Sequence, residues 1–123
     1  MKMRNQTVGF MGEELAADYY INNGYFIAER NYVFNHGEID IIAENETEIV
    51  FVEVKTRKYS EGRNPREAVD TQKIIKVKSC AENFLLRSHL KNFLKVRYDI
   101  VEVILDKNGG FGEVEINVIK NAF

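Results

Sequence analysis

The sequence is poor in cysteine and proline: its 123 residues include one of each, and the cysteine is Cys80. A single cysteine excludes an internal disulfide and a cysteine-based zinc site, and we expect Cys80 to be a small buried residue on a helix. The chain also lacks an apolar run near the roughly 20 residues that a membrane-spanning helix needs. Residues 1–7 lack the apolar stretch of a signal peptide. We therefore expect a cytoplasmic protein without a membrane partner.

Several common functional motifs are missing as well. The sequence has no glycine-rich phosphate loop, no dinucleotide-binding fingerprint and no serine–histidine–aspartate arrangement. It has no internal repeats and no low-complexity linker. A chain of 123 residues is long enough for one hydrophobic core. We expect a single domain over residues 1–123.

Charge is nearly balanced but unevenly distributed. The net charge of −2 argues against a strongly basic nucleic-acid binder. Residues 55–97, however, hold 12 of the 17 lysines and arginines and only 4 of the 19 acidic residues. This basic segment could hold a phosphate backbone, or it could be an ordinary solvated helix face.

Hydrophobic periodicity and turn signals predict a helix, three strands, a long helix and two strands. The predicted ranges are 8–23, 25–34, 37–42, 49–57, 65–88, 96–105 and 111–119, and the long helix has Asn64 as its predicted N-cap. This order predicts an α/β domain with a mixed β-sheet of about five strands flanked by helices. The first three strands are expected to form a meander, and the long helix to return the chain to the sheet.

The second and third predicted strands carry acidic and basic side chains among apolar ones. Alternation places Glu38 and Asp40 on one face of the second strand, with Ile39 and Ile41 on the other. In the third strand, the side chains of residues 53, 55 and 57 share a face. We therefore treat this pair of strands as the candidate functional centre.

The link between these strands is short and polar, which is typical of a hairpin. A two-residue turn would make Asp40 a diagonal neighbour of Glu53, and a four-residue loop would place the two residues directly opposite. Either even length brings both carboxylates and Lys55 to one side, whereas an odd length would separate them.

Two adjacent carboxylates repel each other unless a cation lies between them. Hard oxygen ligands favour Mg²⁺ or Mn²⁺, so Asp40 and Glu53 are candidate metal ligands. Lys55 could orient a water molecule or offset charge on a phosphate. Glu13 lies on or beside the buried stripe of the first helix, where a carboxylate needs a partner. The alternatives are an ordinary exposed strand face for Glu53, Lys55 and Arg57, whose charges can pair with those of neighbouring strands, and a helix-dipole interaction for Glu13.

The basic segment after the third strand supplies candidate nucleic-acid contacts. Arg57, Lys58 and Arg63 lie in or beside a polar loop, and Lys73 lies on the long helix. Such side chains can contact a phosphate backbone, although each could also be an ordinary solvent-exposed cation. Further along, Arg97 and the structural residue Asp99 share a strand face, where they could pair.

Motifs spread from residue 9 to the end of the chain resemble one known family. They are Gly12-Glu13, Gly37-Glu38-Ile39-Asp40, Phe51-Val52-Glu53-Val54-Lys55, Lys73 and Tyr98-Asp99-Ile100-Val101. This set resembles the YraN-like family of uncharacterised predicted endonucleases (uncharacterised protein family 0102). That family is similar to archaeal Holliday-junction resolvases of the restriction-endonuclease-like superfamily.

The resemblance implies a restriction-endonuclease-like fold and an endonuclease dependent on Mg²⁺ or Mn²⁺. Its substrate would be DNA, with branched or structured DNA among the candidates, and the related resolvases imply a homodimer. Asp40, Glu53 and the backbone carbonyl of Val54 would hold the metal ion, and Glu13 and Lys55 would complete the catalytic group. Two alternatives remain open: a catalytically inactive nucleic-acid-binding module of the same fold, and a protein-interaction domain.

Overall fold

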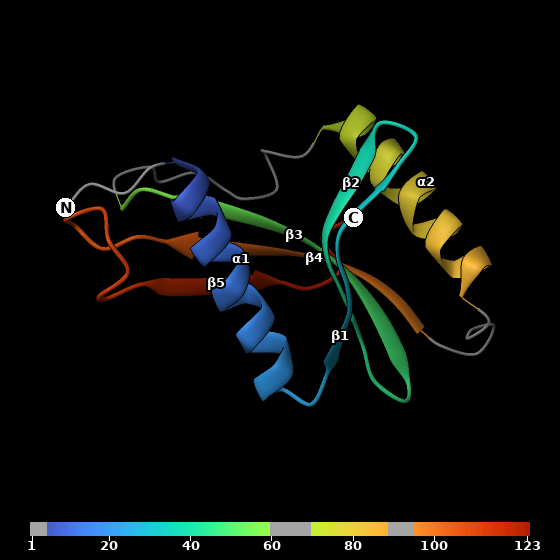
Figure 1. The fold of residues 1–123 in the computed structure, drawn as a ribbon, viewed down its shortest axis with the longest axis horizontal. Helices are drawn as coiled ribbons and strands as arrows, with labels where there is room; N and C mark the ends of the chain where they lie inside the picture. The colour runs from blue at the N-terminus through green and yellow to red at the C-terminus, as the bar shows by residue number, and fades with distance from the viewer. Residues whose placement is uncertain (1–4, 60–69, 89–94) are drawn as a thin grey trace.

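The computed structural model describes residues 5–59, 70–88 and 95–123, and its elements follow the predicted order (Figure 1). They are α1 (Asn5–Asn22), β1 (Phe26–Phe34), β2 (Gly37–Glu44), β3 (Glu48–Arg57), α2 (Thr71–Arg87), β4 (Lys95–Ile104) and β5 (Glu115–Ile119).

One mixed sheet contains all the described strands, in the order β1-β2-β3-β4-β5. β1, β2 and β3 form an antiparallel meander, β3 and β4 are parallel, and β5 is antiparallel to β4. Parallel neighbours need a long crossover connection, and α2 lies in the connection between β3 and β4. The predicted α/β class, mixed five-stranded sheet and element order are therefore confirmed.

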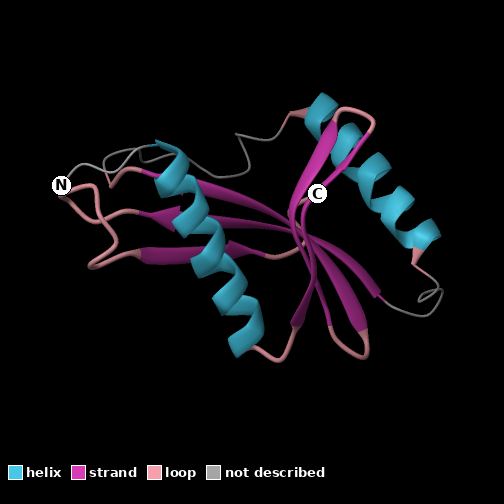
Figure 2. Cartoon of the chain, in the orientation of Figure 1, coloured by secondary structure: helices cyan, strands magenta, loops and turns pink. Residues whose placement is uncertain are grey.

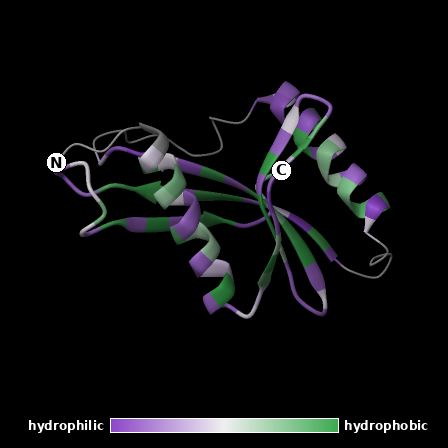
Figure 3. Ribbon diagram, in the orientation of Figure 1, coloured by the Kyte–Doolittle hydropathy of each residue, from purple (hydrophilic) through white to green (hydrophobic). Residues whose placement is uncertain are grey.

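The two helices cover opposite faces of the sheet (Figure 2). α1 packs against one set of alternate β3 residues, including Val50 and Val52. α2 packs against the other set, including Ile49 and Phe51, and it buries Cys80 as predicted. Burial on both faces explains why the central strands are so apolar (Figure 3). Neither described helix combines the length and apolarity needed to cross a membrane.

Helix α2 begins later than the sequence predicted. Asp70 is extended, with φ −85° and ψ 174°, and its side chain accepts a hydrogen bond from the Lys73 backbone N–H. Asp70 is therefore the N-cap of α2, because it satisfies a backbone donor that the first turn leaves free. The predicted cap Asn64 and the start of the predicted helix lie outside the described residues.

The last strand is also shorter than predicted, beginning at Glu115 rather than at residue 111. Asp106 accepts hydrogen bonds from three backbone N–H groups, those of Asn108, Gly110 and Gly112. By holding these three donors, the Asp106 carboxylate closes residues 106–112 into a loop, so pairing with β4 begins only after the loop.

Strand β2 does not keep the simple alternation expected of it. Ile41 packs on the α1 side of the sheet, but Ile39 packs on the α2 side, so the two residues do not share a face. The paired part of β2 and β3 stops at Ile41 and Val52. Beyond it, the Asp40 carboxylate accepts the Val54 backbone N–H at 2.8 Å. The interruption thus directs the Asp40 side chain at the backbone of β3.

A buried polar network joins α1 to β4 away from these carboxylates. Asp99 is fully buried and accepts the Tyr20 hydroxyl at 2.7 Å. Arg97 binds the same carboxylate through Nε at 2.8 Å and through a second guanidinium nitrogen at 3.0 Å. Arg97 also reaches Glu48 at 2.8 Å. The predicted pairing of Arg97 with Asp99 is confirmed, and every member of the network has a partner.

Candidate metal and nucleic-acid site

Two adjoining cavities lie over β2 and β3. The cavity on the α1 side has a volume of about 440 Å³, and Glu13, Asp40, Glu53 and Lys55 line it. The cavity on the α2 side has a volume of about 380 Å³, and it shares Asp40 and Glu53 while adding Lys73. The structure therefore brings together the four residues that the sequence suggested as catalytic, and the two central carboxylates belong to both cavities.

The loop between β2 and β3 decides how these carboxylates meet. Glu44 pairs with Ile49, so four residues form the loop. Asn45 closes it: its side-chain oxygen accepts the backbone N–H groups of Thr47 and Glu48, each at 2.9 Å. Asparagine commonly makes such side-chain bonds to the backbone ahead of it, which explains this loop length.

The four-residue loop corresponds to the second of the two arrangements considered from the sequence. The pairing of β2 with β3 ends at Ile41 and Val52, one residue short of Asp40 and Glu53. Asp40 and Glu53 nevertheless line the same two cavities, which agrees with the prediction that they lie close together. The hydrogen bond from Val54 then fixes the Asp40 carboxylate at this position.

Asp40 lies in an electrostatically unfavourable place for an ionised carboxylate. Burial, followed by repulsion from Glu53, raises the pKa of Asp40 to about 7, although the Val54 N–H works in the opposite direction. Glu13 and the exposed Glu38 add to the repulsion. Because burial and nearby carboxylates oppose ionisation of Asp40, a bound cation would stabilise the ionised form.

Glu13 joins the cluster from α1, and its neighbour does not. Burial, with the Glu38 and Glu53 carboxylates, raises the pKa of Glu13, while Arg30 and a hydrogen bond with Asp40 lower it. Glu14 is instead bound to the Arg30 guanidinium in an ion pair. The structure therefore places Glu13, rather than Glu14, at the cavity.

The residue before Glu13 allows α1 to approach the sheet closely. A Cβ atom on Gly12 would lie 2.1 Å from the Thr56 hydroxyl oxygen, far inside any permitted contact. Gly12 is thus needed to hold Glu13 close to β3, which gives the Gly-Glu motif a steric explanation.

We expect Gly12→Ala to lower the free energy of unfolding by about 1–3 kcal/mol, because the new methyl group forces α1 away from the sheet. Gly9→Ala on the same helix is the matched control, since a Cβ there meets nothing within 4 Å. Alanine is the better helix former, so this control should be stabilised by up to about 1 kcal/mol. Urea unfolding checks both values; equal effects of the two substitutions would contradict the steric explanation.

Two lysines neutralise Glu53 from different elements. Lys73 Nζ of α2 lies 2.6 Å from Glu53 Oε1, and Lys55 Nζ of β3 lies 3.5 Å from the same atom. Partial burial works against the charge of Lys73, but its contact with Glu53 raises the pKa of Lys73 above its ordinary value. Lys73 is therefore a charged member of the central cluster.

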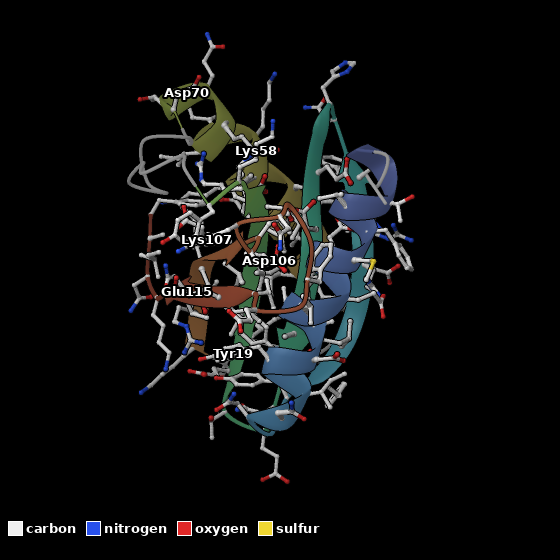
Figure 4. The ribbon with its side chains drawn as sticks, turned by 90° about the vertical axis from the view of Figure 1, so that its left-hand side faces the viewer. Tyr19, Lys58, Asp70, Asp106, Lys107 and Glu115 are labelled. Carbon is white, nitrogen blue, oxygen red and sulfur yellow. The ribbon has the colours of Figure 1, made fainter. Side chains whose placement is uncertain are left out.

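The other predicted nucleic-acid contacts differ in their surroundings. Arg57 Nε forms a 2.8 Å ion pair with Glu102, and both side chains are largely buried. Lys58 is exposed, and in Figure 4 it lies toward the same end of the molecule as Asp70, opposite Tyr19. Arg63 lies outside the described residues.

Sequence reasoning missed part of the α2-side cavity. Its further lining residues are His36, Gly37, Glu38, Asp70, Gln72, Lys76 and Val77. Gly37 could have indicated this cavity from the sequence, because a glycine can mark a close approach of two elements. A Cβ atom there would lie 2.7 Å from the Lys76 carbonyl oxygen. A second Gly-Glu pair thus marks the second close helix-to-strand approach at the site.

The residues present fit a magnesium or manganese ion in a specific way. In residues 5–59, 70–88 and 95–123, no group of three or more acidic, histidine or cysteine side chains forms a ready-made metal cluster. The donor set is instead the carboxylate pair of Asp40 and Glu53. Magnesium is commonly held by one or two carboxylates, with water and substrate phosphates completing its coordination. The carboxylate oxygen donors also suit manganese.

The position of Asp40 predicts a pH-dependent stability. The folded protein keeps the Asp40 proton up to about pH 7, whereas an unfolded chain releases it near the ordinary pKa of 3.8. The unfolded state binds fewer protons in this interval, so the metal-free protein should lose stability as the pH rises through it.

Asp40→Asn cannot ionise, and we expect it to exceed the wild type in free energy of unfolding by up to about 4 kcal/mol at pH 8 and to match it near pH 4. Urea unfolding in chelator at both pH values measures the difference. Asp18→Asn, which removes the same charge from an exposed position on α1, should show no such pH dependence. A difference for Asp40→Asn that is constant between pH 4 and pH 8 would contradict the prediction.

Comparison with known proteins gives one consistent result. Residues 12–103 match the family described as "Uncharacterised protein family UPF0102". The chain is 42% identical over 120 residues to a UPF0102 protein of Clostridium botulinum (strain 657 / Type Ba4), which covers 97% of this chain and 95% of that protein. It is 40% identical over 119 residues to one of Syntrophomonas wolfei, with 97% and 99% covered. It is 41% identical over 121 residues to one of Caldicellulosiruptor bescii, with 98% and 100% covered.

Proposed function

The chain belongs to the uncharacterised protein family UPF0102, as its motifs predicted, and from the geometry of its acidic site we propose that it is a metal-dependent endonuclease acting on DNA. The observation that carries the proposal is the meeting of Glu13, Asp40, Glu53 and Lys55 in one cavity. The order of helices and strands also supports a restriction-endonuclease-like fold. We place the activity in the cytoplasm.

The proposed ligands for Mg²⁺ or Mn²⁺ are the Asp40 and Glu53 carboxylates and the Val54 carbonyl. When bound, the ion would act as a Lewis acid on the phosphate and lower the pKa of a bound water. Asp40 is held for this role by the Val54 N–H at 2.8 Å. Glu53 is 6% exposed, so its charge is little screened by solvent.

The protein side chains would supply the remaining functions. Lys55 would orient the attacking water and offset charge that develops on the phosphate. Glu13, whose pKa is raised by burial, would hold a water molecule or share a proton with Asp40. Together these groups can position the nucleophile and stabilise the charge of phosphodiester hydrolysis.

Substrate binding would draw on the basic segment. Lys58 is exposed and Lys73 lines the α2-side cavity, so both can approach a phosphate from solvent. Arg57 would act differently, because its largely buried side chain forms an ion pair with Glu102. Arg63 is assigned to the same group from the sequence. Phosphate contacts of this kind make affinity fall steeply with salt concentration.

A cleavage panel tests the proposal. Purified protein is incubated with single-stranded, duplex, flap and four-way DNA in magnesium, manganese or chelator. We expect cleavage of at least one DNA in either metal and none in chelator. Cleavage that persists in chelator would contradict a metal-dependent mechanism.

The second candidate is a nucleic-acid-binding module of the same fold that does not cut. The ion pair of Lys73 with Glu53 favours it, since this lysine already neutralises a proposed ligand. Salt-dependent binding of the DNA panel without any cleavage in either metal would support this candidate.

A further inference from the structure

The Lys73 ammonium is bound to a carboxylate that the proposed function assigns to the metal ion. Its Nζ lies 2.6 Å from Glu53 Oε1, a short charge-assisted hydrogen bond. Lys55 approaches the same oxygen only to 3.5 Å. The Glu53 side chain is 7% exposed, so little water is available to replace a lost partner. Lys73 is thus the principal counter-ion of this carboxylate in the metal-free protein.

The first turn of α2 holds Lys73 in this position. Its backbone N–H donates to Asp70 Oδ1 at 2.8 Å, which anchors the residue to the helix cap. The side chain is nevertheless 38% exposed and lines the open cavity on the α2 side. The backbone is therefore fixed, while the ammonium has room to leave Glu53 without a movement of the helix.

We propose that Lys73 is a positioning residue that exchanges partners: it occupies Glu53 in the metal-free protein, gives up that oxygen when a divalent cation binds, and then holds a substrate phosphate in the α2-side cavity. The proposal rests on the proposed function for the identity of the metal site. A divalent cation on the Glu53 carboxylate would repel an ammonium bound to the same carboxylate, so metal binding favours the departure of the ammonium. Released into a cavity beside the site, the ammonium can meet a phosphate oxygen as a point charge.

This exchange has a measurable consequence for metal affinity, separate from activity. If Lys73 competes with the metal ion for Glu53, removing the charge of Lys73 should strengthen metal binding. The same substitution should weaken DNA cleavage, because a cation that holds the substrate is lost. Breaking one partly exposed ion pair corresponds to an increase in Mn²⁺ affinity of about 3- to 10-fold. A lysine that only supports the fold, or only binds DNA, would leave Mn²⁺ affinity unchanged.

The experiment is a calorimetric titration of the full chain with Mn²⁺ alone, in the absence of DNA. Lys73→Met removes the charge and keeps the length of the side chain, and Lys73→Arg keeps a cation that can bind Glu53. Lys78→Met is the matched control, because Lys78 lies on the same helix but contacts the Tyr98 ring, at 5.5 Å from its centre. Circular dichroism establishes that each variant is folded.

We expect Lys73→Met to bind Mn²⁺ about 3- to 10-fold more tightly than the wild type, with Lys73→Arg and Lys78→Met close to the wild type. Lys73→Met should also cleave DNA more slowly at saturating Mn²⁺. Unchanged or weaker Mn²⁺ binding by Lys73→Met would overturn the exchange. An equal gain in Mn²⁺ affinity by Lys78→Met would also overturn the exchange, because the effect would then come from net charge alone.

The two proposals fail in different ways. A wild type that neither binds Mn²⁺ nor cleaves DNA removes the proposed function, and the exchange falls with it. A wild type that binds Mn²⁺ and cleaves DNA, together with a Lys73→Met variant of unaltered Mn²⁺ affinity, removes the exchange alone.

Discussion

Asp40→Asn is expected to slow metal-dependent DNA cleavage by about a thousand-fold or more, because it replaces one of two charged metal ligands with a neutral amide. The substitution keeps the shape of the side chain and an oxygen that can still accept the Val54 N–H. The fold should therefore survive, and the metal-free variant should become more stable than the wild type as the pH rises from about 4 to 7. Initial cleavage rates at saturating DNA over a range of Mg²⁺ concentrations measure the effect.

Lys55→Ala should reduce cleavage by a similar factor through a different route. It removes the cation that faces the cavity beside Glu53, and with it the charge that would stabilise the reacting phosphate. Asp18→Asn and Lys120→Ala alter exposed charges elsewhere and should cleave as the wild type does. Undiminished cleavage by both Asp40→Asn and Lys55→Ala would refute the assigned mechanism.

Asp99→Ala is expected to lower the free energy of unfolding by about 3–5 kcal/mol, because it leaves the Arg97 guanidinium without its principal partner. Asp99 is fully buried and accepts hydrogen bonds from Arg97 and from Tyr20. It also accepts the backbone N–H of Asn121 at 3.2 Å, so its loss would loosen the C-terminal segment. Urea unfolding at neutral pH measures the change.

Tyr20→Phe provides the graded comparison for this network. It removes one hydroxyl donor to Asp99 and keeps the aromatic ring in the core, so it should cost only about 1 kcal/mol. A loss below about 1 kcal/mol in Asp99→Ala would show that Arg97 finds another partner and that the network contributes little.

Much of the candidate site follows from local patterns. The alternation of apolar residues in 49–57 predicts a strand with Glu53 and Lys55 on one face, and both line the same cavity. The polar link between the strands predicts a hairpin, and the structure confirms it. These predictions hold because side-chain direction in a strand depends only on neighbouring residues.

Other features could not be predicted in this way. The change of face between Ile39 and Ile41 depends on where β2 separates from β3. The cap at Asp70 replaced the predicted start of the long helix, since sequence patterns locate helix ends less well than helices. The ion pair of Arg57 with Glu102 could not be predicted either, because Glu102 comes from a strand far along the chain.

The sequence by itself determined the order of the elements and the face on which Glu53 and Lys55 lie, because each depends on residues close together in the chain. The mixed sheet was then predicted from the order of the elements. Only the tertiary structure decided that Glu13 reaches Asp40 from one helix and that Lys73 reaches Glu53 from the other. Those contacts depend on how closely each helix approaches the sheet. Gly12 and Gly37 set that distance, and their effect becomes visible only when Thr56 and Lys76 are seen opposite them.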